Sequence, residues 1–345
     1  MSHSSASARR RGTTYPTNAW YAVATSDEVG RTPLARRAVD LPVVLWRLES
    51  GRAVALEDRD AHRPYPLSLG RVAGDTIVSG YSGFAYGQDG TCVFVPTQPQ
   101  VPFGAKVRAF PTREQHGLVW VWPGDPGWSG LRPPPPTPWL ADPAWATFGD
   151  AWLTRANVLL LHENFADITH VAVVDPYISP PVLNATPPPL EVEVAETTVA
   201  FHRDYPPARL APWHAEVLGL DPELEHRQRE EGAFVAPGLW VDRWDVTAGE
   251  ATHAFRFTHA VTPVSSNQTR HIWRVSRNFA PDEATTQRLR PIFSDYYRTV
   301  RDILETMQTV VDTDGQRTEV SVASDAAALQ VRKIIGRLVA DERGG

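Results

Sequence analysis

A histidine with carboxyl groups close to it in the sequence is the first candidate for catalysis. Asp167 and His170 are three residues apart, and Asp175 follows five residues later. A neighbouring carboxylate orients an imidazole ring and raises its pKa, so this group is expected to act as a general acid or base. The alternative interpretation is a buried cluster whose polar groups satisfy one another. Tyr177 and His162 lie nearby in the sequence and are further candidates.

Alternating side chains on two expected strands are candidates for the wall of a pocket. Trp240, Asp242 and Trp244 share one parity, so they face the same side of a sheet. Phe257 and His259 share parity on the next expected strand. Such a wall would combine indole rings with one carboxyl group in an apolar cavity. The alternative is ordinary packing between two layers of the fold.

The elements that position these side chains are predicted from the periodicity of apolar residues. A helix is expected over residues 154–170, which would place Glu163, Asp167 and His170 on one face. Partial alternation predicts four stretches of strand at 190–205, 239–246, 250–263 and 269–280. Helical spacing predicts two later amphipathic helices, at 291–311 and from Ser324–Asp325 onward.

The first third of the chain predicts β structure. Gly and Asp turn signals separate short apolar runs at 43–48, 53–58, 75–83 and 117–122. An Asp-Gly step within 87–91 predicts a hairpin, and a proline run predicts a stiff connector between domains. The expected division is a disordered tail at 1–14, a β domain at 15–130, a connector at 131–143 and a second domain at 144–345.

The composition argues against several classes of protein. The net charge is −6 and no basic stretch is present, so a nucleic-acid partner is not expected. Cys92 is the only cysteine, which excludes a disulfide within the chain and any site with two cysteine ligands from one chain. No apolar run approaches the roughly 20 residues that span a bilayer. A cytoplasmic protein without membrane contact is expected.

Six segments carry family-like sequence in a fixed order, among them "HENFADITH" and "ILETMQ". They cover residues 18–29, 66–96, 116–125, 162–170, 259–279 and 303–308. Together they resemble the α subunits of Rieske non-haem iron oxygenases, especially the vanillate-demethylase-like branch. The resemblance implies an α+β fold, with an N-terminal Rieske-like all-β domain and a C-terminal helix-grip domain of an antiparallel sheet on long helices. It also implies a homotrimer.

In that family a [2Fe–2S] cluster is held by two cysteines and two histidines. The resemblance aligns these ligand positions with Asp60, His62, Ser79 and Ser82, so one ligand of four remains. A chain whose only cysteine is Cys92 cannot supply two thiolates. The sequence therefore predicts the loss of the cluster. We expect Asp60, Ser79 and Ser82 to bond to one another across the two loops, and His62 to be structural.

The family's mononuclear iron is held by two histidines and one carboxylate. The resemblance aligns these positions with His170, Asp175 and Val300. Valine has no donor atom, so the family's triad is excluded. A different site built from His170, Asp175 and a residue near Asp295 or Asp302 stays open as an alternative.

The predicted loss of both metal sites determines the functional hypothesis. The leading hypothesis is a cofactor-independent, redox-neutral cyclase, pericyclase, isomerase or lyase that uses the former iron-site pocket. Its substrate would be an apolar, polyketide-like intermediate of specialised metabolism, and neither a metal, a reductase nor a ferredoxin is expected. One alternative is a catalytically silent subunit that binds a small molecule or partners an active paralogue. The other is a mononuclear-metal oxygenase with altered ligands.

Overall fold

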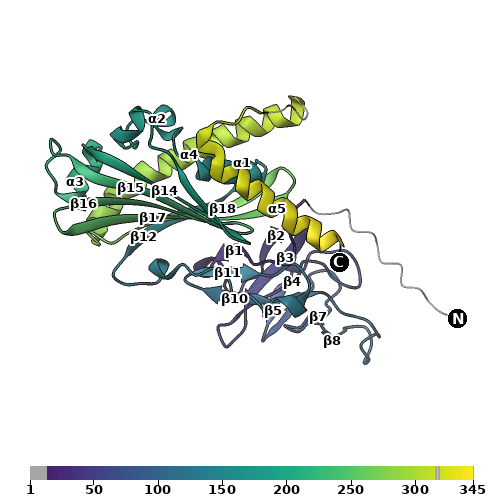
Figure 1. Ribbon diagram of the computed structural model, residues 1–345. Helices are drawn as coiled ribbons and strands as arrows, with labels where there is room; N and C mark the ends of the chain where they lie inside the picture. Colours follow the sequence, from purple (N-terminus) through teal and green to yellow (C-terminus); the bar gives the residue numbers. More distant parts are fainter. Residues whose placement is uncertain (1–13, 315–316, 318, 345) are drawn as a thin grey trace.

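The computed structural model describes residues 14–314, 317 and 319–344. The tail expected at 1–14 lies, except for its last residue, outside the described residues. A smaller N-terminal part is built from short strands, and a larger C-terminal part from one broad sheet with long helices (Figure 1). The predicted α+β class, with an all-β N-terminal domain and a C-terminal domain of sheet and helices, is confirmed. None of the described helices has the length and apolar content that crossing a membrane requires.

Three small antiparallel sheets make up the N-terminal part. In sheet order their strands are β1 (Tyr21–Thr25), β11 (Leu118–Val121) and β10 (Thr112–Gln115); β2 (Leu34–Ala38), β3 (Leu41–Arg47), β4 (Ala53–Glu57) and β9 (Ala109–Phe110); β5 (Arg71–Ala73), β6 (Thr76–Val78), β7 (Ala85–Tyr86) and β8 (Cys92–Phe94). The hairpin predicted at 87–91 joins β7 to β8, with Gly90 at a φ of 80°. Within the run at 75–83, β6 covers Thr76–Val78, and the loop that aligns with the family's second cluster loop begins at Ser79.

One seven-stranded antiparallel sheet organises the C-terminal part. In sheet order its strands are β12 (Ala146–Thr154), β18 (Gln268–Arg277), β17 (Ala251–Ser265), β16 (Leu239–Ala248), β15 (His226–Val235), β14 (Thr198–Ala208) and β13 (Glu191–Val194). The stretch expected at 190–205 is two strands, β13 and β14, joined by a tight turn. Strands β12 and β15 were not predicted from the sequence. The buried positions of β15 include Gln228 and Glu230, so its pattern lacks the apolar residues that mark a strand.

Five helices and six short 3₁₀ turns complete the described fold. They are α1 (Val158–Ala166), α2 (Val171–Val174), α3 (Pro212–Leu218), α4 (Glu283–Asp314) and α5 (Ala326–Gly344), with η1 (Ser26–Glu28), η2 (Leu67–Leu69), η3 (Pro126–Trp128), η4 (Pro138–Leu140), η5 (Pro181–Asn184) and η6 (Ala323–Asp325). The helix expected from residue 291 begins earlier and includes Pro291 in its interior.

The helix expected over 154–170 is wrong at both ends. Asn157 caps α1, because its side chain accepts a hydrogen bond from the Leu159 amide at 2.8 Å. Asp167 follows the helix with extended backbone, at a φ of −141°. Glu163, Asp167 and His170 therefore do not share a helix face.

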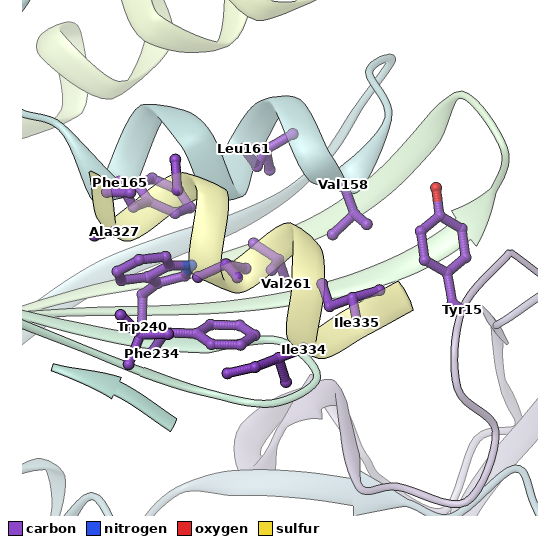
Figure 2. Packing of buried hydrophobic residues seen from close by; sticks show 14 of the residues in the cluster. Tyr15, Val158, Leu161, Phe165, Phe234, Trp240, Val261, Ala327, Ile334 and Ile335 are labelled. Carbon is purple, nitrogen blue, oxygen red and sulfur yellow. The ribbon is translucent and has the colours of Figure 1, made fainter. Parts of the chain in front are cut away.

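Helices α1 and α5 cover one end of the large sheet. Figure 2 shows Leu161 of α1 and Ile334 and Ile335 of α5 packed with Phe234 and Trp240 of the sheet. Helix α4 contributes to the same core from further along the sheet. Burial of these large apolar side chains fixes the helices against the strands and stabilises the fold.

Direct bonds join the N-terminal part to the C-terminal sheet. Thr262 Oγ1 on β17 donates to the carbonyl oxygen of Ala22 on β1 at 2.7 Å. Arg270 on β18 forms an ion pair with Glu28 at 2.6 Å. The N-terminal part and the C-terminal sheet are therefore packed directly against each other.

Candidate functional site

The two loops that align with the family's cluster ligands are joined by a network around Asp60. This side chain is fully buried, and its Oδ2 accepts hydrogen bonds from Ser79 Oγ and Ser82 Oγ at 2.5 Å each. Its Oδ1 accepts from Tyr86 at 2.7 Å. Burial acts to raise the pKa of Asp60, but the three hydroxyl donors hold that pKa below its ordinary value. The predicted bonding of Asp60 to Ser79 and Ser82 is confirmed, whereas the contribution of Tyr86 was not predicted.

These loops do not fit a [2Fe–2S] cluster. Cys92 lies on β8, buried, with its thiol 3.4 Å from the Phe94 carbonyl oxygen, and the sequence contains no other cysteine. The ring of His62 stacks on Phe84 at a centroid distance of 5.2 Å. A Rieske cluster requires two thiolates that this chain cannot supply.

The group proposed for acid–base catalysis is not assembled. His170 Nδ1 bonds to the backbone carbonyl of Asp167 at 2.7 Å, while the Asp167 carboxylate accepts from the amide and hydroxyl of Thr169. Asp175 accepts from the backbone amides of Tyr177 and of the residue after it, and so forms a local turn. Burial lowers the pKa of His170, opposite to the direction expected from its sequence neighbours.

The positions aligned with the family's iron ligands do not form a metal site either. Val300 is buried in the core on α4. Asp295 pairs with Arg298 at 2.6 Å, and Asp302 pairs with Arg301 at 2.9 Å, both near the surface. Within the described ranges, no group of three or more His, Cys, Asp or Glu side chains could hold a metal ion. The residues present therefore do not fit the family's iron.

A partly enclosed pocket of about 120 Å³ lies between the large sheet, α3 and α4. Of the predicted site residues, Asp242, Trp244, Phe257, His259 and His170 line it. Its other lining residues are Asn164, Phe165, Ile168, Val171, Ile178, Pro180, Leu183, Phe201, Trp213, His214, Glu230, Glu231, Arg243, Phe255, Phe293, Tyr296 and Tyr297. The walls are mainly aromatic and aliphatic, which is typical of sites for small organic ligands.

Several predicted site residues lie outside the lining of this pocket. Trp240 Nε1 donates to His162 Nδ1 at 2.8 Å within the core, and burial lowers the pKa of His162 to about 3. For Trp240 the packing alternative is therefore correct. Tyr177 is exposed. Asp167 borders a second hollow between α1, α4 and α5, which His170 and Val300 also border.

A chain of buried titratable groups leads into the pocket wall. His259 Nδ1 lies 3.1 Å from His271 Nε2, and His259 Nε2 lies 3.7 Å from Asp242 Oδ2. Burial raises the pKa of Asp242 well above its ordinary value and lowers that of His259 well below. Burial therefore disfavours the charged form of both groups. Such a chain can orient a polar ligand or pass a proton along the wall.

A second buried polar group lies on the neighbouring strands. Glu230 Oε2 accepts from Tyr205 at 2.6 Å and from Arg203 at 3.3 Å. Sequence reasoning missed Glu230 and His214. The strand that carries Glu230 was missed as well, and His214 lies in a short helix without a recognisable motif.

Comparison with known proteins gives a consistent result. The family model of the vanillate O-demethylase oxygenase C-terminal domain matches residues 154–341, and that of the Rieske [2Fe-2S] domain matches residues 19–111. An iron–sulfur subunit of Comamonas testosteroni, attributed to a toluene-4-sulfonate monooxygenase system, is 32% identical over 95% of this chain and 98% of its own. The vanillate O-demethylase oxygenase subunit of a Pseudomonas species is 27% identical over 95% of this chain and 96% of its own.

The fold of a solved oxygenase agrees with these matches. The crystal structure of dicamba monooxygenase bound to 3,6-dichlorosalicylic acid superposes with a TM-score of 0.85 and 25% identity, covering 95% of this chain and 99% of that one. The relatives are enzymes, which supports the general prediction of an enzyme. The predicted type is contradicted, because these relatives are named as oxygenase components and not as cofactor-independent cyclases, isomerases or lyases of specialised metabolism.

The expectation that the protein works without a reductase or ferredoxin is also contradicted. The relatives are named as subunits or components of oxygenase systems, including a dicamba O-demethylase and a chloroacetanilide N-alkylformylase. An oxygenase component works with further proteins of its system. The prediction of a small organic substrate is compatible with these names, and the predicted homotrimer stays a prediction.

Proposed function

Because the chain belongs to the family of Rieske oxygenase α subunits typified by vanillate O-demethylase, we propose that it is the substrate-binding component of an oxygenase system. The residues at its cluster and iron positions do not fit the family's metals. A metal-bearing chain of the same family therefore carries the iron chemistry, and this chain assembles with it. The role corresponds to the partner-subunit alternative that the sequence left open.

The observation that carries the proposal is the pocket between the sheet and α4. Its volume of about 120 Å³ is close to that of an apolar cavity, roughly 150 Å³, that holds a benzene molecule. Phe165, Phe257 and Phe293 supply aromatic surface around it. A single-ring compound would gain dispersion and hydrophobic contact on several sides. The relatives named for toluene-4-sulfonate and vanillate are also named for single-ring compounds.

A mixed-assembly experiment tests this proposal. The chain is purified alone and together with a metal-bearing family oxygenase from the same organism, and light scattering after size exclusion measures complex formation. Aromatic substrates, O₂ and the electron-transfer proteins of the system are then added, and mass spectrometry follows oxygenated product. We expect a mixed complex whose substrate range differs from that of the metal-bearing chain alone.

Two results would contradict the proposal. One is the absence of any complex, together with an unchanged substrate range. The other is stoichiometric iron and oxygenated product from this chain by itself, which would make it a complete oxygenase with ligands outside the family positions.

A further inference from the structure

Several polar atoms in the wall of the aromatic pocket have no hydrogen-bond partner among the described residues. Glu230 Oε1 and Asp242 Oδ1 are unpartnered acceptor sites, and Trp213 Nε1 and Trp244 Nε1 are unpartnered donors. Glu230 is only 2% exposed, so bulk water does not satisfy it. Buried polar groups without partners are unfavourable and uncommon. This wall therefore has hydrogen-bonding capacity that a bound molecule can use.

The register of the sheet brings the two carboxyl groups to one face. Glu230 on β15 lies opposite Trp244 on β16, and Gly232 lies opposite Asp242. Glu230 and Asp242 are therefore diagonal neighbours on the pocket side. A side chain at Gly232 would collide with the ring of Phe201, because a Cβ there would lie 2.1 Å from that ring. Gly232 thus leaves room for an aromatic wall beside the two carboxyl groups.

Positive charge around the pocket is already committed. Arg203 pairs with Glu230 Oε2 at 3.3 Å, and Arg243 pairs with Glu231 at 3.1 Å. Burial lowers the pKa of His214 to about 3 and that of His259 well below its ordinary value, so both rings are neutral at physiological pH. An anion in this pocket would lose its hydration without gaining an unpaired cation, which is costly.

We infer that the pocket binds a small aromatic molecule whose polar group donates hydrogen bonds and carries no negative charge. The inference rests on the proposed substrate-binding role and specifies its chemical class. Glu230 Oε1 and Asp242 Oδ1 accept from the N–H or O–H groups of such a molecule, and an acceptor atom on it accepts from the indole N–H of Trp213 or Trp244. A carboxylate of the same size can accept from the indoles and from the ring of His214, but it has no donor for the two carboxyl oxygens and leaves them unsatisfied.

Three probes of nearly equal size and shape test the class. Benzamide is neutral, benzamidine is cationic and benzoate is anionic at neutral pH, and isothermal titration calorimetry measures the affinity of the full chain for each. We expect benzamide and benzamidine each to bind about tenfold or more tighter than benzoate. Only benzoate lacks a donor and leaves the buried oxygens of Glu230 and Asp242 without a hydrogen bond. Benzoate that binds as tightly as the other two would overturn the inference while leaving a substrate-binding pocket. If none of the three binds, the proposed function fails together with it.

The Asp242→Asn variant tests whether Asp242 causes the preference for benzamide and benzamidine over benzoate. The amide has the same size and adds a donor that can reach a carboxylate, so the preference over benzoate should fall several-fold. Asp245→Asn is the matched control on the same strand, because Asp245 faces the other side and pairs with Arg256 at 2.6 Å. It should keep the wild-type preference. An unchanged preference in Asp242→Asn, or the same loss in both variants, would contradict the assignment to Asp242.

Discussion

Two buried aspartates, one in each part of the molecule, meet very different surroundings. Asp60 in the N-terminal loops receives three hydroxyl donors at 2.5, 2.5 and 2.7 Å and a backbone amide from His62. Asp242 in the C-terminal pocket has one oxygen without a partner and the other 3.7 Å from His259. The same side chain thus has a lowered pKa in one place and a raised pKa in the other.

The contrast separates a structural group from a binding group. A carboxylate whose hydrogen-bonding sites are all occupied holds its loops together and has little capacity left for a ligand. A buried carboxyl group with an unpartnered oxygen reduces the stability of the folded protein, and that cost is offset only when a ligand binds. The N-terminal loops therefore form a satisfied structural network, whereas the wall of the C-terminal pocket keeps hydrogen-bonding capacity for a ligand.

The largest effect is expected from Asp60→Ala. The substitution leaves the hydroxyls of Ser79, Ser82 and Tyr86 without their shared acceptor in a buried place. Hydrogen bonds to a charged group contribute about 1.5–3 kcal/mol each, and partial entry of water offsets some of the loss, so we expect the free energy of unfolding to fall by about 3 kcal/mol. Urea denaturation followed by circular dichroism measures the change.

Glu49→Ala is the control for that measurement. Glu49 is 69% exposed on the side chain and lies 3.9 Å from Arg31, so its loss should change stability by less than about 1 kcal/mol. Equal stability of Asp60→Ala and the wild-type protein would mean that the network does not hold the loops together.

The sequence predicted the two aspartate sites to different extents for a physical reason. The Asp60 network follows from positions that the family resemblance fixes, so its bonding could be predicted before any geometry was known. Tyr86 was not predicted because nothing in the linear sequence shows that this β7 residue lies beside a loop residue 26 positions earlier. In the C-terminal part, strand parity put Trp240, Asp242 and Trp244 on one side of the sheet, and the last two line the pocket.

The missing parts of the pocket also have a cause. Glu230 lies on a strand whose inward positions are polar, so the apolar alternation that marks a half-buried strand is absent. The group of Asp167, His170 and Asp175 failed because α1 ends at Ala166, which removes the helical spacing on which the prediction depended. The hypothesis of a cofactor-independent cyclase or isomerase failed for a different reason. Missing metal ligands exclude a metal from this chain, but they give no information about the other proteins with which the chain works.

A second prediction concerns the loss of stability at low pH that buried His162 causes in the C-terminal part. Buried His162 accepts a hydrogen bond from Trp240 and has a pKa of about 3, against 6.5 for an exposed histidine. The unfolded chain therefore binds a proton that the folded chain refuses, and stability is lost as the pH falls below 6.5 toward 3. At pH 5.5 this single group should cost about 1.4 kcal/mol.

His162→Gln isolates that contribution, since a glutamine oxygen can still accept from Trp240. The loss of unfolding free energy between pH 7.5 and 5.5 should be smaller in this variant than in the wild-type protein by about 1.4 kcal/mol. His202→Gln, on a surface-reaching ring beside Glu191, is the control and should retain the wild-type loss. An identical pH dependence in all three proteins would show that His162 is protonated in the folded state.

The smallest effect, and the one of opposite sign, is expected from Asp242→Asn in the absence of ligand. The amide avoids placing a carboxyl group where burial disfavours its charge, so the variant should be more stable than the wild-type protein at pH 7 by about 1 kcal/mol. Because the pKa of Asp242 is raised, the unfolded chain releases its proton first as the pH rises, and the advantage of the amide should grow from pH 4 to pH 7.

The comparison with Asp245→Asn decides whether this gain belongs to the pocket. That variant loses the ion pair with Arg256 and should be equal to or less stable than the wild-type protein at pH 7. Thermal and urea unfolding at both pH values measure the two differences. A less stable Asp242→Asn would mean that this carboxylate is satisfied in the free protein as Asp60 is. The pocket would then be a second closed structural network, and the distinction between the two aspartates would be lost.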